Sequence, residues 1–406
     1  MVLLSALVLP ARAAARDAVP GRLIVSFKTA VSHGAARDAL DRAGARVVRR
    51  LSGIRAFTVR PRGDRSRASL GRALRRLKDV RYAEHDFYLR TSATVPDDPL
   101  FTRQYGLPSD PGIAATSAWD HRTKCGRVAT LDSGAQLDHP DLKGNFWHNP
   151  DEIKGNKKDD DHNGYVDDYY GVDIYDGSGG GADADGHGTH VAGILGGHGD
   201  NALGVAGVCW QAQIMPIRFM NANGRGSTSD AVAGIEYAIK EHAKVVNCSF
   251  GSSSKSSALS DAVGDAKGKG VLLVVAAGND GDSIDKTPEY PAAYTYANIL
   301  TVAATTDSDT LASFSNYGSK SVDLAAPGDD IWSTYLGSGY KQLSGTSMAA
   351  PFVTGAAAML RAKDSDLTYS DVKSALKKTV DKLPALSGKT VTGGRINLGR
   401  ALGSVG

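Results

Sequence analysis

The sequence predicts an α/β fold in which helices cover both faces of a parallel sheet, preceded by a small α+β unit. From about residue 125 onward, short apolar segments alternate with longer segments of helical periodicity. The short segments are apolar throughout, which is typical of strands buried on both faces. With 406 residues, 41% of them hydrophobic, the chain can form one large domain and a smaller one.

The large unit is expected to alternate strands with helices. Strands are predicted at residues 127–131, 213–219, 243–248, 271–277 and 299–303. Helices are predicted at residues 187–196, 229–242, 257–267, 347–361 and 369–378. Ligands bind such sheets beyond the carboxyl ends of the strands. Asp132 follows the first predicted strand and Asn279 follows the fourth, so we expect both at that edge.

The small unit precedes this alternation, at residues 21–90. Its strands are predicted at residues 22–28, 54–60 and 80–88, and its helices at residues 35–43 and 70–77. Residues 91–99 contain Thr, Ser, Pro and Asp without periodicity, so we expect a linker or a cleavable segment there.

Charge divides the chain into a basic and an acidic part. Residues 21–93 hold 18 Lys and Arg against 6 Asp and Glu, a balance of +12. The whole chain carries only +3 and residues 1–20 carry +1, so residues 94–406 carry −10. The two parts should attract each other. A nucleic-acid-binding arm is the weaker interpretation, because Arg72, Arg75 and Arg76 lie on an amphipathic helical pattern.

The N-terminus has the pattern of a secretory signal. An apolar stretch at residues 2–9 precedes the small-x-small sequence Ala11-Arg12-Ala13, so we expect a signal peptide at residues 1–15 and an extracellular protein. The usual basic start is missing, which a start codon further upstream would explain. The alternative is a frayed apolar end. No later stretch is long and apolar enough to span a membrane.

The three cysteines have different surroundings. Cys125 and Cys209 each precede a predicted strand, so they can pair if those strands are neighbours. Export would permit such a disulfide. Cys248 lies in an apolar run and is expected to be a buried free thiol.

Ser347 lies in the most unusual surroundings of the sequence. Small residues crowd around it, Gly345 allows a sharp turn before it, and an apolar run follows from Met348 to Leu360. A serine at a helix start has free backbone N–H groups nearby, which favour negative charge. Ser347 could therefore attack a carbonyl, provided that an oriented base lies beside it. A turn or helix cap is the alternative role for such a serine.

A base and an orienting carboxylate are found in two further motifs. Asp132 ends a buried strand, where a carboxylate needs a partner such as a histidine N–H. His187 and His190 are three residues apart and can face the same way on a helix. A zinc pair is the competing hypothesis, but a third ligand and the Glu of a His-Glu-x-x-His motif are missing. We expect His187 to be the base and His190 to be a structural hydrogen-bonding residue.

Asn279 could stabilise the negative charge that such a reaction develops. It follows the strand at residues 271–277, where Gly278 breaks the pattern. An amide at the end of that strand can donate its N–H to an oxyanion. By itself the stretch would also suit a simple Asn turn.

Taken together, these motifs resemble the subtilisin-like serine proteases, or subtilases, over about residues 100–380. The order Asp, His, Ser along the chain is the one known for subtilisin. Residues 21–92 resemble the family's inhibitory prodomain more loosely. The resemblance rests on Leu131-Asp132-Ser133-Gly134, His187-Gly188-Thr189-His190-Val191-Ala192-Gly193 and Gly345-Thr346-Ser347-Met348-Ala349-Ala350-Pro351.

The resemblance implies a subtilisin-like fold with a prodomain at residues 16–92 and a catalytic domain at residues 93–406. Ser347 would be the nucleophile, His187 the general base, Asp132 the residue that orients it, and Asn279 the oxyanion donor. It also implies polypeptide substrates, inhibition by the chain's own prodomain, and a monomer that binds no nucleic acid. An inactive peptide-binding relative and a serine esterase are the alternatives. The complete triad and the glycine-bearing edge segments argue against them.

The resemblance also places the substrate contacts. Two edge segments would clamp an extended peptide by β-augmentation, and a pocket lined by carboxylates would favour Arg or Lys before the scissile bond. Phe250 would narrow an apolar subsite, and Glu289 could instead point to solvent. Arg90 and Ser92 are candidate points of self-cleavage. The expected contact residues are Gly224, Arg225, Gly226, Ser249, Phe250, Gly251, Ala277, Gly278, Asp280, Glu289 and Asp185.

Residues 159–168 resemble the first part of a calcium loop. Carboxylates recur at alternate positions around a turn-forming glycine, and a cation would relieve their mutual repulsion. A bidentate Glu at the twelfth position is missing, because Tyr170 stands there. A solvated acidic loop is the alternative. The expected ligands of a structural Ca²⁺ are Asp159, Asp161, Asn163, Tyr165 through its carbonyl, Asp167 and Asp168.

Overall fold

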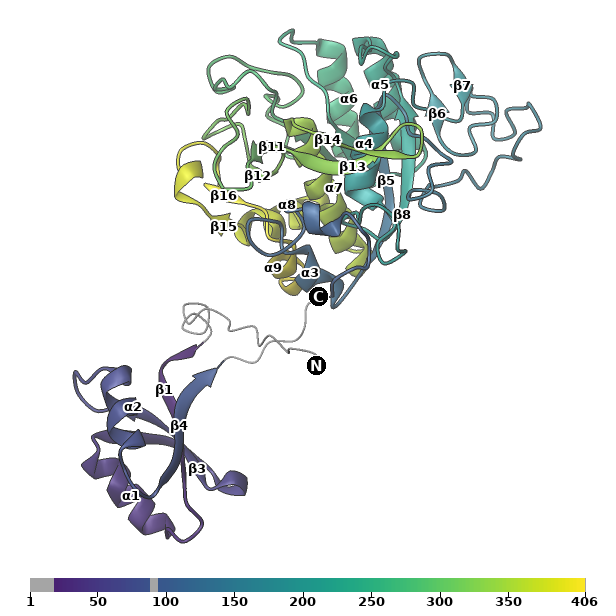
Figure 1. Ribbon diagram of the computed structural model, residues 1–406. Helices are drawn as coiled ribbons and strands as arrows, with labels where there is room; N and C mark the ends of the chain where they lie inside the picture. The colour runs from purple at the N-terminus through teal and green to yellow at the C-terminus, as the bar shows by residue number, and fades with distance from the viewer. Residues whose placement is uncertain (1–17, 88–93, 406) are drawn as a thin grey trace, which may run out of the picture. The chain divides into compact units, whose positions relative to one another are not determined.

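The computed structural model describes residues 18–87 and 94–405 of the chain (Figure 1). The chain divides into two compact units, Met1–Ser92 and Ala93–Gly406, each with its own hydrophobic core. The expected signal peptide and both candidate cleavage points, Arg90 and Ser92, lie outside the described residues. No helix among the described residues is long and apolar enough to cross a membrane.

The first unit is an antiparallel sheet in the order β2-β3-β1-β4. Its strands are β1 (Ala18–Phe27), β2 (Ala45–Leu51), β3 (Ala56–Pro61) and β4 (Val80–Phe87). The sequence did not predict β2, because Arg46, Arg49 and Arg50 interrupt its apolar alternation. A short 3₁₀ turn, η1 (Ser52–Ile54), joins β2 to β3.

Two helices, α1 (His33–Arg42) and α2 (Arg67–Arg75), complete this unit. Each begins at a serine, Ser32 or Ser66, whose hydroxyl accepts a backbone N–H three residues further on. Leucines of both helices pack with Leu23, Val25, Phe57 and Val59 of the sheet, so within residues 18–87 both helices cover the same face. The predicted α+β architecture is confirmed.

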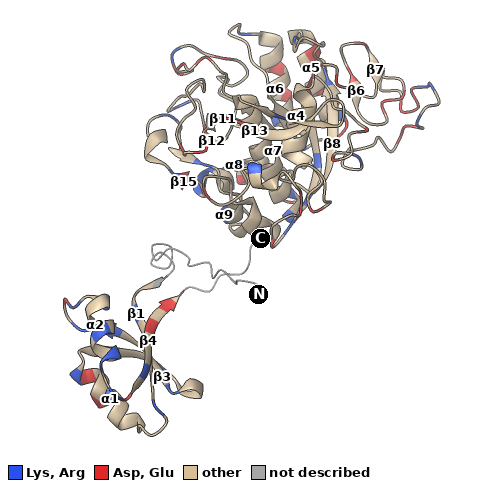
Figure 2. Ribbon diagram, in the orientation of Figure 1, with Lys and Arg blue, Asp and Glu red and all other residues tan. Residues whose placement is uncertain are grey.

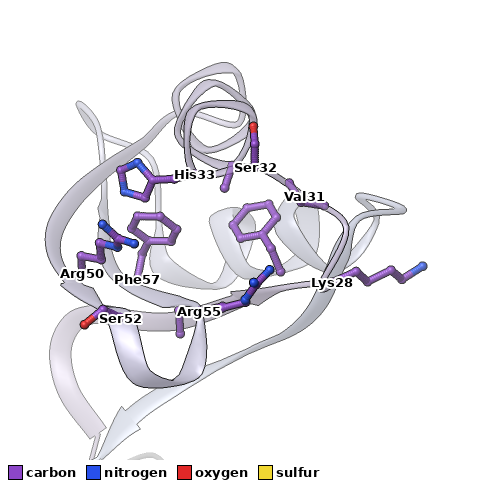
Figure 3. A pocket seen from close by; sticks show the side chains of 11 residues that line it. Lys28, Val31, Ser32, His33, Arg50, Ser52, Arg55 and Phe57 are labelled. Atoms are coloured by element: carbon purple, nitrogen blue, oxygen red, sulfur yellow. The ribbon is translucent and has the colours of Figure 1, made fainter.

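A cavity of about 370 Å³ lies beside the start of α1 in this unit (Figure 3). Phe27 and Phe57 form part of its wall, and the exposed side chains of Lys28, Arg50 and Arg55 lie around them. Figure 2 shows blue Lys and Arg positions on the helices and strands of this unit, with red Asp and Glu positions on β4 and near α1. The excess positive charge expected from the sequence is therefore carried largely by side chains that face solvent.

The second unit contains a ten-stranded sheet in the order β15-β16-β12-β11-β10-β9-β5-β8-β6-β7. Pairing is parallel from β16 to β6 and antiparallel only at the two edges. The strands are β5 (Lys124–Asp132), β6 (Val172–Asp173), β7 (Ser178–Gly179), β8 (Gln211–Arg218), β9 (Val245–Cys248), β10 (Leu272–Ala276), β11 (Ile299–Thr305), β12 (Leu324–Pro327), β15 (Asp381–Lys382) and β16 (Gly394–Arg395). A separate hairpin pairs β13 (Ile331–Tyr335) with β14 (Gly339–Leu343).

Helices cover both faces of this sheet, as the sequence predicted (Figure 1). One apolar cluster holds side chains of α3 (Ala115–Trp119), α4 (His187–Gly196), α7 (Thr346–Lys363), α8 (Tyr369–Lys378) and α9 (Leu398–Gly403). The other cluster holds those of α5 (Thr228–Lys240) and α6 (Ser257–Gly268). Two 3₁₀ turns, η2 (Phe101–Arg103) and η3 (Pro384–Leu386), complete the second unit.

The predicted segments of the second unit all occur, with ends displaced by a few residues. The sequence did not predict the two-residue edge strands, which are too short for a periodic signal, or the hairpin, whose strands are polar or only partly apolar. Residues 94–99, the described part of the predicted linker or cleavable segment, make hydrogen bonds with the second unit. Thr94 donates to the Asp120 carboxylate at 2.7 and 2.6 Å, and the buried Asp98 carboxylate accepts the Asp200 N–H at 2.8 Å.

Cys125 and Cys209 form a disulfide. Cys125 belongs to β5 and Cys209 lies two residues before β8, and the two strands are neighbours in the sheet. Cys248 is a buried free thiol in β9. The pairing that the sequence left open is thus decided by strand order.

Candidate active site

Asp132 and His187 meet at the carboxyl edge of the sheet. Asp132 is the last residue of β5 and is fully buried, and His187 is the first residue of α4. The Nδ1 atom of His187 lies 2.7 Å from Oδ1 of Asp132. The imidazole therefore has a fixed orientation, with its other nitrogen left for another partner.

A second carboxylate, Asp183, holds this turn in place. Its Oδ1 accepts the Ser133 hydroxyl at 2.9 Å, and its Oδ2 accepts the N–H and hydroxyl of Thr189 at 2.8 and 2.6 Å. The Ser133 hydroxyl in turn accepts the Gly188 N–H at 2.9 Å. Asp183 thus ties the end of β5 to the first turn of α4. Sequence reasoning did not single it out, although a carboxylate before a glycine-led helix is a recognisable cap signal.

Charge and burial act on His187 in opposite directions. Burial lowers the pKa of its imidazole, whereas the negative charges of Asp132, Asp185 and Asp183 raise it. The net shift raises the pKa of His187 above its ordinary value of 6.5. The surrounding carboxylates therefore stabilise an imidazolium that forms at this position.

Ser347 lies in the first turn of α7. Every other residue from Thr346 to Leu360 is buried, so Ser347 is the one partly exposed position before the helix emerges at Arg361–Lys363. Its hydroxyl donates to the Ser249 carbonyl at 3.3 Å, and within residues 94–405 no hydrogen bond joins it to His187. Both side chains line one depression of about 380 Å³, together with Asn279.

Asn279 is held by a residue that the sequence analysis did not single out. Its Oδ1 accepts the N–H and the hydroxyl of Thr346, at 2.8 and 2.9 Å. The Thr346 hydroxyl also accepts the Gly278 N–H at 3.1 Å. With its oxygen committed to Thr346, the Asn279 amide presents its N–H₂ as the free donor beside Ser347.

Most predicted substrate-contacting residues line this depression or the one next to it. Asp185, Gly224, Ser249, Phe250, Gly251, Gly278, Asp280 and Glu289 line the depression that holds Ser347. Arg225 and Gly226 line an adjacent cavity of about 290 Å³, where Phe219 and Phe250 pack edge to face at 4.9 Å. Ala277 is the exception: it is buried, and Ala276 lines the depression instead.

Glu289 faces into the depression and not only into solvent. A side chain added at Gly251 would come within 2.6 Å of its carboxylate, so the two residues are in close contact. Burial, and to a smaller extent the charge of Asp280, raises the pKa of Glu289. The depression therefore has an acidic wall.

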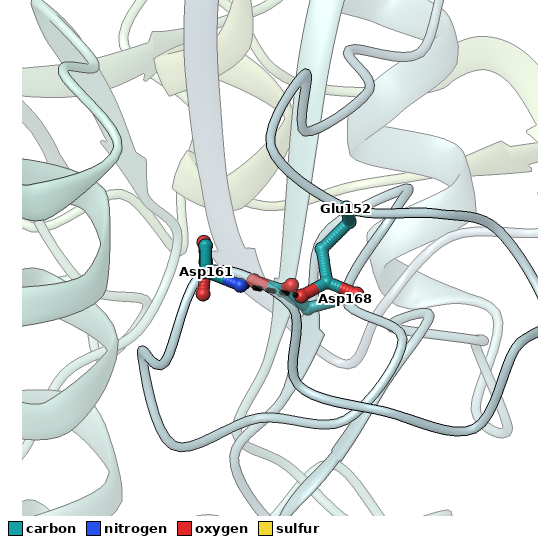
Figure 4. Close-up of side chains that lie close together, drawn as sticks. All are labelled: Glu152, Asp161 and Asp168. Atoms are coloured by element: carbon teal, nitrogen blue, oxygen red, sulfur yellow. Dashed lines mark hydrogen bonds between the residues drawn. The ribbon is translucent and has the colours of Figure 1, made fainter.

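The expected calcium loop gathers only part of the predicted set. Asp161 and Asp168 converge with Glu152, which the sequence analysis missed, so that their oxygen atoms lie within 4.8 Å of one another (Figure 4). Asp159 and Asp167 instead accept backbone N–H groups of the loop, at 2.7 to 3.1 Å. Glu152 was missed because it lies outside the alternating run.

The chemistry of this cluster suits a divalent cation. Glu152 is 5% exposed, and its Oε2 has no hydrogen-bond partner among the described residues. Burial raises the pKa of both Glu152 and Asp168, which shows that their charged forms are costly without compensation. Asn163 donates its amide N–H to both Asp161 and Asp168, and the Tyr165 N–H donates to the Asn163 side chain. A cation bound by these oxygens would remove that cost.

Comparison with known proteins agrees with this fold. Residues 126–396 match the subtilase family, and residues 8–86 match the fervidolysin N-terminal prodomain. The chain therefore belongs to the subtilase family. It is a subtilisin-like serine protease with a prodomain-like region before its protease domain.

Individual relatives cover most of the chain. Thermitase from Thermoactinomyces vulgaris is 38% identical over 310 residues, 76% of this chain and 99% of thermitase. A thermophilic serine proteinase from Bacillus sp. (strain AK1) is 35% identical over 383 residues, 93% of this chain and 86% of the relative. Among solved structures, a protease from Pseudoalteromonas arctica aligns with a TM-score of 0.66 and 30% identity, over 77% of this chain and 99% of that one.

His190 is expected to make the stability of the second unit depend on pH. It is fully buried, and its Nε2 lies 3.0 Å from the carbonyls of Ile331 and Lys341, so it ties α4 to the hairpin. Burial lowers the pKa of His190 to about 4. The unfolded chain then binds the proton more readily than the folded one between pH 6.5 and pH 4. The free energy of unfolding should therefore fall by about 3 kcal/mol as the pH is lowered from 6.5 to 4.

Urea unfolding of a Ser347→Ala chain between pH 4 and pH 7 measures this dependence. Adding His190→Gln should flatten the slope, because Gln keeps a donor but does not titrate. Adding His121→Asn, at an exposed histidine, should leave the slope unchanged. An equal slope with and without His190 would contradict the assignment.

Proposed function

We propose that this protein is a secreted serine endopeptidase that cleaves peptide bonds through an acyl-enzyme, with Ser347, His187 and Asp132 as its triad. The Ser347 oxygen attacks the scissile carbonyl while Nε2 of His187 takes its proton and passes it to the leaving amine. Asp132 holds the imidazole, and Asn279 with the Ser347 N–H stabilises the oxyanion. Water then attacks the acyl-enzyme and restores the serine.

The observation that carries this proposal is the His187–Asp132 hydrogen bond of 2.7 Å, which lies beside the half-buried Ser347 in the first turn of α7. Ser347 already shares a depression with His187, and rotation about its Cα–Cβ bond moves its hydroxyl away from the Ser249 carbonyl. Hydrogen bonds of this kind commonly tighten only when substrate is bound.

We further infer a chain organised as a signal peptide at residues 1–15, a prodomain at residues 16–92 and a catalytic domain at residues 93–406, active as a monomer. The balance of +12 in residues 21–93 and −10 in residues 94–406 supports an electrostatic attraction between prodomain and catalytic domain. Cleavage near Arg90 or Ser92 would release the prodomain.

The change Ser347→Ala should abolish peptide hydrolysis while the fold remains intact. The expected loss of turnover is on the order of 10⁶, the magnitude established for subtilisin when its nucleophile is removed. Turnover of a peptide amide substrate, together with a melting curve of the variant, tests this. Wild-type labelling by a fluorophosphonate, lost in the variant, would tie the chemistry to Ser347. Hydrolysis retained by the variant would refute the triad.

We propose in addition a preference for Arg or Lys before the scissile bond, supported by the acidic wall of the depression. A partly buried carboxylate pairs strongly with a cation, so Glu289 would select a basic side chain and Asp280 and Asp185 would reinforce it.

The change Glu289→Gln should lower kcat/KM for Arg and Lys substrates by about tenfold relative to Phe and Leu substrates. Profiling with a peptide library before and after the change measures this, with Glu236→Gln as a control at an exposed site on α5. A wild-type profile led by Phe or Leu would end the basic-pocket proposal and leave the protease assignment untouched.

We also propose that Glu152, Asp161 and Asp168 hold a structural Ca²⁺, with Asn163 and the Tyr165 carbonyl as further ligands. The buried, unpartnered Oε2 of Glu152 is the observation that supports it. Such an ion would stabilise the loop and take no part in the reaction.

Removal of calcium should lower the melting temperature of the Ser347→Ala chain by about 5 °C, relative to a solution about 100-fold above the Kd. Glu152→Gln should abolish the difference, and Asp151→Asn, at the exposed neighbouring residue, should preserve it. Equal melting temperatures of the unmutated loop with calcium and with chelator would argue against the site.

A further inference from the structure

A chain of buried hydrogen bonds runs beneath Ser347 from a residue two helical turns away. The Thr354 hydroxyl lies 2.8 Å from Oδ1 of Asn247, and Nδ2 of Asn247 donates to the Ser249 hydroxyl at 2.9 Å. The Ser249 hydroxyl donates to the Ser347 carbonyl at 3.0 Å, and the Ser347 hydroxyl donates back to the Ser249 carbonyl at 3.3 Å. This series of hydrogen bonds thus begins and ends on α7 and passes through Asn247 of β9.

Pro351 explains why the last of these hydrogen bonds, from Ser249 to the Ser347 carbonyl, is needed. In a regular helix the Ser347 carbonyl would accept the N–H of residue 351, but proline has none. That carbonyl would be an unsatisfied acceptor at the start of α7, and the Ser249 hydroxyl fills the gap. The peptide group that follows Ser347 is therefore fixed by a side chain outside the helix.

Thr354 sets the donor-to-acceptor direction of every hydrogen bond in this series. Asn247 and Thr354 are fully buried and Ser249 is nearly so. Because the Thr354 hydroxyl donates to Oδ1 of Asn247, the amide must turn its N–H₂ toward Ser249. Ser249 then accepts from Asn247 and has its own proton free for Ser347. The Ala350 carbonyl, 3.0 Å from the Thr354 hydroxyl, is the competing acceptor within the helix.

We propose that Thr354 is a positioning residue for the nucleophile, acting through Asn247 and Ser249 on the first turn of α7. Without its hydroxyl, Oδ1 of Asn247 loses its donor and the amide is free to reverse. Ser249 would then face an acceptor, its proton would turn away from Ser347, and the carbonyl that Pro351 leaves open would lose its partner. The inference rests on the proposed role of Ser347 as the nucleophile.

The test compares Thr354→Val, which keeps the shape of the side chain but not its hydroxyl, with Thr354→Ser, which keeps the hydroxyl. We expect Val to lower kcat by about tenfold with KM changed less than twofold, and Ser to restore most of kcat. The control is Thr305→Val, at another fully buried threonine, whose hydroxyl has no partner among the described residues. It should leave kcat unchanged.

Rates are expressed per active site, counted by fluorophosphonate labelling, so that a smaller folded fraction does not imitate a slower enzyme. If Thr354→Val does not fold, Thr354→Ala serves in its place. A wild-type kcat in whichever of these variants folds overturns the proposal, as does a Thr354→Ser enzyme as slow as the variant without a hydroxyl. Inactivity of the unmutated protein would instead count against the proposed function.

Discussion

The burial of the Asp132 carboxylate is the constraint on which the rest of the site depends. It ends a strand at the centre of the sheet, has no exposure to water, and leaves one oxygen without a partner among the described residues. A charge in such a place is costly unless a donor meets it. His187 supplies the donor. The hydrogen bonds of Ser133 and Asp183 to the first turn of α4 hold His187 next to Asp132. The Asp183 carboxylate accepts five hydrogen bonds from this turn and from Ser133, and these support the single contact between Asp132 and His187.

Helix α7 carries Ser347, and the burial of this helix fixes the position of that serine. It lies against β5, β9, β10, β11 and β12, so its position is set by the whole sheet and not by its own turn. Small residues let α7 pack closely on its surroundings: a carbon added at Gly355 would lie 2.7 Å from Val208, in the segment before β8. A serine in the first turn of such a helix is positioned by most of the core. Thr346 orients the Asn279 amide by two hydrogen bonds, and the Ser249 hydroxyl fixes the Ser347 carbonyl by one.

Local patterns identified the candidate residues and missed several of the residues that hold them. Asp132, His187, Asn279 and Ser347 each stand in glycine-rich or strand-end surroundings, which leave a signal within a few residues. Thr346 and Asp183 were missed because a threonine or an aspartate in a turn is ordinary, and only its contacts show what it does. Glu152 was missed for the same reason: it joins Asp161 and Asp168 only after the loop between them has folded back.

The amino-acid sequence by itself determined the alternation of strands and helices, the family, the charge division and the candidate catalytic groups. These depend on periodicity and on short motifs, which a linear chain records. Only the tertiary structure decided that Cys125 pairs with Cys209 and that Glu289 faces the depression. It also decided which oxygens are left without donors, because that depends on distances between segments a hundred residues apart, which no local pattern encodes.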